Sequence, residues 1–280
     1  MHLVDDTSLS PINRHFSISE YIGAAWSRRA FILEEAKATA FSQGRDTSLG
    51  KLWLVLDPIL QVALYTVVFG LVLNASHGIE NYIGFIVIGV IFFGFVSKGL
   101  NSGSLLLQRF RGLISTFDFP KIVIPAATAI RVALDNSPAC AIAAIMAIAT
   151  SNFSHFPLAP LLSIPLFLLM STLVFGATLI ISWITFKVSD FHQVIGLGTR
   201  ALFFLSGVFF DVNQSSNEAL RHLIQLNPIS TFLTGLRSMF LYDQIPPLSD
   251  WVYLAIWSAV LNIVGFIVYW RYEGSFSNVG

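Results

Sequence analysis

The sequence predicts an all-α integral membrane protein with six transmembrane helices, an N-terminal amphipathic interface helix and a short external re-entrant helical hairpin before the last span. Composition gives two reasons: only 11% of the 280 residues are charged and 55% are hydrophobic, whereas a soluble domain carries about 25% charged residues. The third reason is that the apolar residues gather in six blocks, each near the roughly 20 residues that a helix needs to cross a bilayer. No block alternates like a barrel strand, so the spans are expected to be helices.

The six apolar blocks cover residues 52–75, 82–100, 122–150, 161–186, 194–212 and 251–270. Arg131, Asp135 and Pro138 interrupt the third block and leave its borders the least defined. The chain is therefore divided into a cytoplasmic N-terminal region with the interface helix (1–51), a six-helix transmembrane domain (52–271) and a cytoplasmic tail (272–280).

Lysine and arginine positions predict the orientation, because cytoplasmic segments of membrane proteins are rich in them. Most lie on one side of the predicted spans: Arg14, Arg28, Arg29, Lys37, Arg45, Lys51, Arg109, Arg111, Lys121, Lys187 and Arg271. The opposite loops carry only Arg221 and Arg237. Both termini are expected in the cytoplasm, with the spans in a plasma (bacterial inner) membrane.

Residues 18–41 precede the first block and have helical periodicity. Ile18, Ile22 and Trp26 fall on one face, while Glu20 and Glu35 fall largely on the other. This pattern favours an amphipathic helix on the inner membrane surface. The alternative is a helix packed on a small cytoplasmic domain, for which the chain has too little sequence.

Two further segments are too polar to span. Residues 108–121 (QRFRGLISTFDFPK) form a short mixed polar and aromatic loop, and a plain membrane loop has the same look. Residues 211–250 predict two short amphipathic helices broken at Asn227-Pro228. That hairpin either dips into the outer leaflet or lies flat on the headgroups.

The segment from Gly44 to Lys51 has a superficial likeness to a phosphate-binding loop. That motif has four residues between its glycines and a Ser or Thr after the lysine. Here five residues separate Gly44 from Gly50, Leu52 follows Lys51, and no strand precedes them. We interpret the glycines as a bend between surface helix and first span, and we expect no ATP-hydrolysing site in this chain.

Charges inside the blocks are candidate functional residues. Asp57 lies one turn into the first block beside Pro58, and Arg200 is expected in the inner part of the fifth. Arg131 and Asp135 are spaced i, i+4, which predicts an ion pair along one helix face. A structural role for that pair is favoured over a proton relay.

Enzymatic chemistry has no support in the sequence. No Ser-His-Asp, paired-carboxylate or Cys-His arrangement stands out, and no metal site is predicted. The net charge of zero gives no argument for a nucleic-acid partner. Aromatic residues are abundant (25 Phe, 7 Tyr and 6 Trp). Many lie near span ends, as interfacial belts require, and some are suited to line a carbohydrate path.

Three motifs in order resemble the type-2 ABC exporter permeases for polysaccharides (O-antigen, teichoic acid or cell-wall galactan). DTSLGKLWLVLDPILQVALYTVVFG is similar to the family's run Thr-x-Leu-Gly-x-Leu-Trp followed by Pro-Ile, here with Gly50, Trp53 and Pro58. LLLQRFRGLISTFDFPKIVIP is similar to its loop after span two, and LIQLNPISTFLTGLRSMFL to its Asn-Pro motif before the last span. Asp57 departs from the family pattern, as does Phe41-Ser42-Gln43 in place of a basic, aromatic pair.

The resemblance implies a homodimer of this chain with two copies of a separate ABC ATPase subunit, which would bind the ATP and Mg. The cargo would be a glycan on a polyprenyl-diphosphate lipid, moved from the cytoplasm to the outer side. Spans one and five of the two protomers would line the path, and membrane lipid would surround them.

The resemblance also assigns roles to residues. The ATPase-coupling segment would contain Gln108, Arg109, Arg111, Phe117, Asp118 and Phe119. The start of the first span, a gate, would contain Gly50, Trp53, Asp57 and Pro58. An external gate hairpin would contain Asn227, Pro228 and Arg237. On the interface helix, Arg28, Arg29 and Lys37 are hypothesised to recognise a lipid head group; topology-setting charge is an equally good explanation.

Three other classes remain open from sequence alone. A secondary transporter or channel is expected to show repeated halves and broken midplane helices, and no convincing repeat is present. A membrane enzyme acting on lipid-linked sugars would need clustered acidic or histidine residues. A type-2 ABC permease for a drug or another lipid is the nearest alternative, and the polymer itself is not specified by the sequence.

Overall fold

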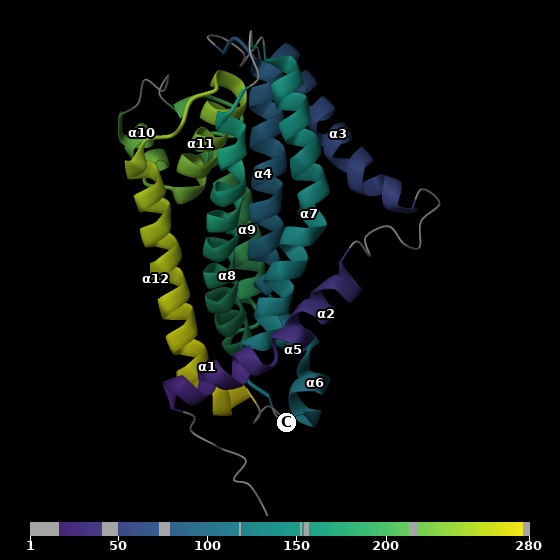
Figure 1. Ribbon diagram of the computed structural model, residues 1–280, viewed down its shortest axis with the longest axis vertical. Helices are drawn as coiled ribbons and strands as arrows, with labels where there is room; N and C mark the ends of the chain where they lie inside the picture. Colours follow the sequence, from purple (N-terminus) through teal and green to yellow (C-terminus); the bar gives the residue numbers. More distant parts are fainter. Residues whose placement is uncertain are drawn as a thin grey trace, which may run out of the picture.

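The computed structural model describes residues 17–40, 50–72, 79–117, 119–151, 153, 157–212 and 218–276. Every secondary-structure element within those ranges is a helix, as the sequence predicts. The helices form an elongated bundle with several short helices gathered at one end (Figure 1).

Four helices are long and apolar enough to cross a membrane: α4 (Tyr82–Gly103), α7 (Val123–Thr150), α8 (Ser163–Lys187) and α12 (Leu248–Tyr272). They confirm the second, third, fourth and sixth predicted blocks as long apolar helices. α7 runs unbroken through Arg131 and Pro138. The protein is therefore a multi-pass membrane protein.

The first predicted block is a composite helix. α3 (Trp53–Tyr65) continues into η3 (Thr66–Val72), a π-helix. Pro58 lies inside α3, and Trp53 is its first residue. η2 (Gly50–Leu52) precedes α3, and Gly50 has a φ of 50°, a left-handed conformation that glycine adopts without strain.

The predicted border of the fifth block, 194–212, is wrong at its C-terminal end. α9 covers Phe191–Leu205 and then stops. Gly207 has a φ of 65°, so the chain turns there. Val208 and Phe209 follow the turn and are buried against the bundle. Apolar residues therefore continue past the helix, which is why hydropathy alone places the border too late.

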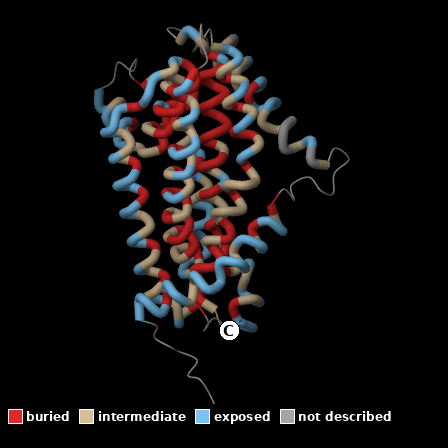
Figure 2. The backbone as a smooth tube through the Cα atoms, in the orientation of Figure 1, coloured by how far each residue is buried: buried red, intermediate tan, exposed pale blue. Residues whose placement is uncertain are grey.

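α4 is the central helix of the bundle. In its apolar stretch 78% of the residues are buried, against 17% in α12 at the edge. It packs on α3, α7, α8, α9 and α11 (Pro228–Tyr242). Figure 2 shows the buried residues gathered in this interior.

Small residues bring neighbouring helices close together. A Cβ built on Gly176 of α8 would lie 2.7 Å from the backbone nitrogen of Asn262 on α12. A Cβ on Gly265 of α12 would lie 2.7 Å from Cβ of Leu179 on α8. Small residues such as these glycines let the backbones of membrane helices approach closely.

The predicted single surface helix at 18–41 is wrong in one respect, because the structure divides it. α1 (Ile18–Ser27) and α2 (Arg29–Thr39) meet at Arg28, whose φ of −91° and ψ of 9° are not helical. Ser17 caps α1 through a capping box with Glu20. The apolar face also divides, since Ile22 and Trp26 are exposed whereas Ala36 is buried.

Short helices form one end of the bundle, which we call the basal end: α1, α2, α5 (Leu106–Arg109), α6 (Arg111–Thr116) and η6 (Glu273–Phe276) (Figure 1). The segment 108–121, for which the sequence predicts a loop or a coupling helix, contains the end of α5 and all of α6. At the opposite end lie η4 (Ala159–Leu162) and the predicted hairpin, formed by α10 (Glu218–Gln225) and α11. α11 is buried in the bundle and does not lie flat across its end.

Gly176→Ala is expected to destabilise the protein by about 1–3 kcal/mol, because the added methyl group meets backbone atoms of α12. Gly94→Ala on α4 is the matched control, since a Cβ there has nothing within 4 Å. Thermal unfolding in detergent measures both. Equal melting temperatures for the two variants would contradict the close approach of α8 and α12.

Candidate functional site

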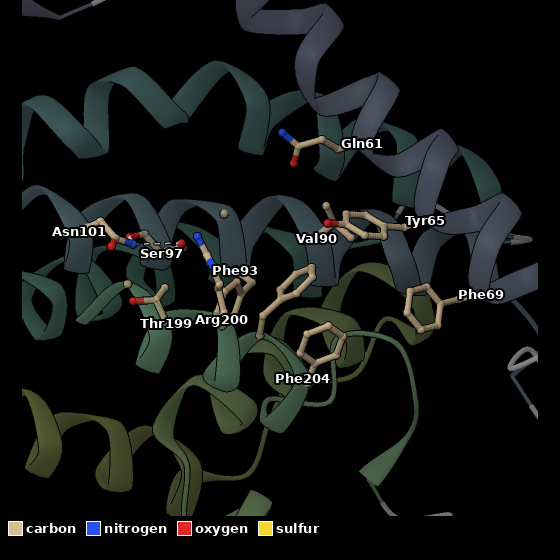
Figure 3. Close-up of a pocket in the computed structure, with 13 residues that line it drawn as sticks. Gln61, Tyr65, Phe69, Val90, Phe93, Ser97, Asn101, Thr199, Arg200 and Phe204 are labelled. Atoms are coloured by element: carbon tan, nitrogen blue, oxygen red, sulfur yellow. Dashed lines mark hydrogen bonds between the residues drawn. The ribbon is translucent and has the colours of Figure 1, made fainter. Parts of the chain in front are cut away.

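A cavity of about 560 Å³ opens between α3, α4 and α9. Its volume lies within the roughly 300–1,000 Å³ typical of ligand pockets. The first and fifth predicted spans, which the sequence expects to line a path, thus lie on either side of it. The lining residues are Gln61, Tyr65, Phe69, Val90, Phe93, Gly94, Ser97, Asn101, Gly196, Thr199, Arg200, Phe203 and Phe204 (Figure 3).

One end of the cavity is aromatic. The ring of Tyr65 lies 5.6 Å from that of Phe203, and Phe203 lies 5.0 Å from Phe93. Phe69 stacks on Phe209 with 3.9 Å between ring centroids. These rings come from α3, η3, α4, α9 and the turn after α9, so the aromatic cluster joins the cavity walls.

The other end of the cavity is polar. Ser97 and Asn101 of α4 lie there with Thr199 and Arg200 of α9 (Figure 3). Gln61 of α3 also lines the cavity. α4 continues from Asn101 toward α5, so the polar end faces the basal end of the bundle.

Asp57, the unexpected charge of the first span, is explained in part by this cavity. The Gln61 side-chain amide donates to Asp57 Oδ2 at 3.1 Å, one turn apart on α3. Asp57 therefore fixes the orientation of a cavity-lining amide. Its predicted partners at the start of the span, Gly50 and Trp53, lie nearer the basal end and do not line the cavity. The rejected phosphate loop at 44–51 falls largely outside the described residues.

At the basal end the predicted coupling residues divide into two groups. Gln108 is tied to the bundle, because its amide donates to the Thr185 carbonyl of α8 at 2.8 Å. The backbone N–H of Leu105 donates to the Thr185 hydroxyl at 3.2 Å. Phe119 is half-buried, and its ring lies 6.5 Å from that of Phe31 on α2. Arg109, Arg111 and Phe117 are exposed, and Asp118 lies outside the described residues.

The sequence reasoning missed the carboxylate of Glu273, which joins three segments at the basal end. The Tyr21 hydroxyl of α1 donates to its Oε2 at 2.7 Å. The backbone N–H of Lys121, just before α7, donates to its Oε1 at 2.9 Å. Lys121 Nζ lies 4.0 Å from the same oxygen. No spacing rule connects these three residues, so only the fold reveals the cluster.

The Tyr21 phenol is fully buried in this cluster. Burial first, and the neighbouring Glu273 carboxylate second, raise the pKa of Tyr21 well above its ordinary value. The hydroxyl therefore stays protonated and remains a hydrogen-bond donor to Glu273 across the physiological pH range.

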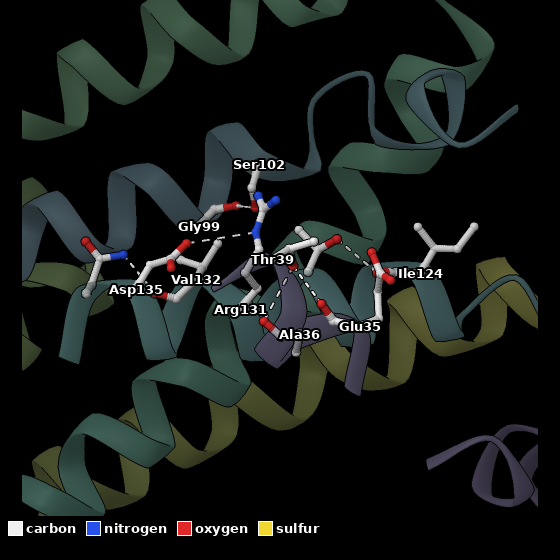
Figure 4. Close-up of polar contacts among 11 residues, drawn as sticks. Glu35, Ala36, Thr39, Gly99, Ser102, Ile124, Arg131, Val132 and Asp135 are labelled. Atoms are coloured by element: carbon white, nitrogen blue, oxygen red, sulfur yellow. Dashed lines mark hydrogen bonds and ion pairs between the residues drawn. The ribbon is translucent and has the colours of Figure 1, made fainter. Parts of the chain in front are cut away.

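The predicted ion pair on α7 is confirmed. Arg131 Nε lies 3.9 Å from Asp135 Oδ2. Figure 4 shows the pair beside Thr39 of α2, which packs on α7. Arg28 and Arg29 are exposed at the bend between α1 and α2, and Lys37 pairs with Glu34 at 3.1 Å. The recognition of a lipid head group by Arg28, Arg29 and Lys37 stays a prediction.

Asn227 connects the hairpin to the end of α9 through hydrogen bonds. Its side-chain oxygen caps α11 by accepting from the Ile229 N–H at 3.0 Å. Its amide donates to the Ser206 hydroxyl at 2.8 Å. Pro228 occupies the first turn of α11, where its missing N–H leaves no intrahelical bond unmade.

Arg237 of α11 makes further hydrogen bonds between the hairpin and the bundle. It is buried, and its guanidinium donates to the carbonyls of Gly207 at 2.8 Å, Val208 at 3.0 Å and Phe85 at 3.3 Å. The guanidinium carbon lies 3.3 Å from the centroid of the Phe85 ring. Arg237, counted in the sequence as a loop charge, therefore joins α11, the turn after α9 and α4.

Comparison with known proteins decides the family. The sequence model of the ABC-2 type transporter family matches residues 36–241, which is most of the chain and includes the cavity and the hairpin. The chain belongs to the ABC-2 type transporter family.

Relatives of this ABC-2 transporter chain carry a more specific description. This chain is 22% identical over 219 residues to the O-antigen export system permease protein RfbA of Myxococcus xanthus, and the alignment covers 78% of this chain and 82% of that protein. It is 22% identical over 240 residues to the protein of the same name from Klebsiella pneumoniae, covering 84% and 89%. ABC-2 transporter chains are transport subunits, so the absence of catalytic motifs from the sequence fits this family.

Tyr21→Phe is expected to lower the free energy of unfolding by about 1.5–3 kcal/mol, the usual worth of a hydrogen bond to a charged group. Amide hydrogens of α1 should exchange faster, because α1 loses its bond to η6. Hydrogen–deuterium exchange of the protein in nanodiscs measures this.

Tyr253→Phe serves as the control. It removes a hydroxyl that donates to the Leu226 carbonyl at 2.7 Å, away from the basal end. A double-mutant cycle with Glu273→Gln tests the pairing. Strictly additive effects of Tyr21→Phe and Glu273→Gln would show that the two side chains do not act together.

Proposed function

We propose that this chain is the transmembrane permease subunit of an ATP-driven ABC exporter that moves a polysaccharide, linked to a polyprenyl diphosphate, from the cytoplasm across the plasma membrane. The match of the ABC-2 type transporter model over residues 36–241 carries the proposal. The names of the relatives support a polysaccharide cargo. The cavity with an aromatic and a polar end fits a ligand that combines sugar and charge.

The proposed assembly is a homodimer with two copies of a separate ABC ATPase subunit that binds ATP and Mg. The chain crosses the membrane six times with both termini in the cytoplasm. α3 with η3 is the first crossing and α9 is the fifth. The 15 residues of α9 extend only about 22 Å at 1.5 Å per residue, so the buried α11 occupies the remaining depth.

An exporter of this kind answers a physical need. A phosphate group or a sugar polymer cannot enter hydrocarbon unaided, because each polar group without a hydrogen-bond partner costs several kcal/mol there. The permease supplies a polar and aromatic surface in place of lipid. The ATPase subunit supplies the work, which requires a stiff contact between the two proteins.

The basal end has the construction that such a contact needs. α5 is tied to α8 through Gln108 and Thr185, and α6 follows α5 directly, so a push on them reaches a long helix. Arg109, Arg111 and Phe117 remain exposed for a partner. In this proposal Arg28, Arg29 and Lys37 face the phosphates of the inner leaflet. Asn227, Pro228 and Arg237 stabilise a hairpin that closes the outer mouth.

Reconstitution tests the function as a whole. The purified chain with its ATPase subunit, in liposomes loaded with lipid-linked polysaccharide, is expected to expose the polymer on the far side only with ATP and Mg. Accessibility to an added glycosidase measures this. Transport by the chain alone under an ion gradient would overturn the proposal and favour a secondary transporter.

Phe117→Ala is expected to weaken binding of the ATPase subunit by tenfold or more, because exposed aromatic side chains often dominate an interface. Titration of the permease in nanodiscs with the ATPase subunit measures the dissociation constant. Leu158→Ala is the matched control, since this leucine is similarly exposed and precedes η4 at the opposite end. Equal dissociation constants for both variants and the wild type would contradict a contact at Phe117.

A further inference from the structure

Arg200 contributes the only charged side chain among the described residues that line the cavity. Its side chain is exposed on α9 and lies near Ser97 and Phe93 (Figure 3). No hydrogen bond or ion pair connects its guanidinium to another residue within the described ranges. The other two arginines inside the bundle differ in this respect: Arg131 pairs with Asp135, and Arg237 donates to three carbonyls.

The position of Arg200 makes this exposure significant. At about 1.5 Å per residue, it lies roughly 14 Å along α9 from Phe191. In the proposed fifth crossing, this position places the guanidinium within a hydrocarbon core of about 30 Å. A cation held there without a counter-ion is costly, and such residues mark the paths of ligands and ions.

The guanidinium is the only charged donor among the described residues that line the cavity. Asn101 donates to the Ser97 carbonyl at 2.8 Å, and the Thr199 hydroxyl donates to the Ile195 carbonyl at 2.8 Å. Gln61 donates to Asp57, the nearest acidic residue along α3, which itself does not line the cavity. The polar end is therefore cationic and without an acidic side chain among its described lining residues.

We propose that the polar end of the cavity is an anion site in which the Arg200 guanidinium binds a phosphate group of a lipid ligand. This inference rests on the proposed function and names the part of the cargo that the permease recognises within the membrane. Guanidinium suits this role, because its planar fork offers two parallel hydrogen bonds to phosphate oxygens. A polyprenyl diphosphate and a bilayer phospholipid share this chemistry, so the experiment separates them.

The test uses the complete permease–ATPase complex in phosphatidylcholine nanodiscs. Added probes are polyprenyl diphosphate, the uncharged polyprenol of the same length, and phosphatidylglycerol. Native mass spectrometry measures lipid binding, and the ATPase rate gives a second readout. For the wild type we expect binding and stimulation by polyprenyl diphosphate, and neither by polyprenol.

Arg200→Gln is expected to raise the half-maximal concentration of polyprenyl diphosphate by tenfold or more, and Arg200→Lys to restore part of the response. Lys98→Gln is the matched control, because Lys98 follows Ser97 on α4 but does not line the cavity. Its response should equal that of the wild type. Melting temperatures of the three variants confirm that each is folded.

The outcomes distinguish the anion site from the proposed function. A response to phosphatidylglycerol that Arg200→Gln abolishes supports the anion site and identifies phospholipid as the source. Equal responses of wild type and Arg200→Gln to polyprenyl diphosphate overturn the anion site and leave the exporter standing. Loss of dimer without loss of lipid binding in Arg200→Gln also overturns it, because a second copy then supplies the counter-ion. Arg200-dependent binding in a complex that exports no polysaccharide overturns the function instead.

Discussion

The basal end depends on the half-buried carboxylate of Glu273. A charged group removed from water is tolerated only when hydrogen bonds replace its hydration. Here those bonds come from Tyr21, 252 residues away in the sequence, and from Lys121, 152 residues away. α1, the start of α7 and the end of α12 are consequently held in one arrangement. α5 is bonded to α8, and both α5 and α6 pack in the same hydrophobic cluster as α1, α7 and α12, so this end is attached to three of the four long helices.

The bundle has one tightly packed side and one open side, and the glycines of α4 show the difference. A Cβ on Gly99 or Gly103 would collide with Val174 or Thr178 of α8, so no space is left there. A Cβ on Gly94 would meet nothing within 4 Å, because Gly94 lines the cavity. The same helix therefore closes the core on one face and leaves room for a ligand on another. The cavity on this open side of the bundle is lined by Arg200 and by rings of the aromatic cluster.

Much of the fold could be predicted from local patterns in the sequence. Long apolar runs give α4, α7, α8 and α12, the i, i+4 spacing gives the pair of Arg131 with Asp135, and Asn227-Pro228 marks the break in the hairpin. What failed was long-range or conformational. The turn at Gly207 lies inside an apolar run, so hydropathy cannot place the end of α9.

The contacts of the site were harder to predict than its elements. Glu273 reads as an ordinary charge after the last span, and Arg237 as a loop charge, because their partners come from distant segments. Asp57 is an unexpected charge in the first span, and only the fold shows that its bond partner, Gln61, lines a cavity. The coupling role predicted for Arg109, Arg111 and Phe117 depends on a partner protein, and no pattern within one chain specifies such a contact.

The bonds of Arg237 restrict how the hairpin can move. One guanidinium satisfies carbonyls from the turn after α9 and from α4, so swinging α11 outward by itself would strip three acceptors at once. α11, that turn and the adjoining part of α4 must therefore travel as a rigid body. The cavity walls without a bond to Arg237 are α3 and the helical part of α9, and the π-helical extension of α3 is the least regular part of the wall. We therefore expect the cavity to widen where α3 and α9 meet, while α11 keeps its position.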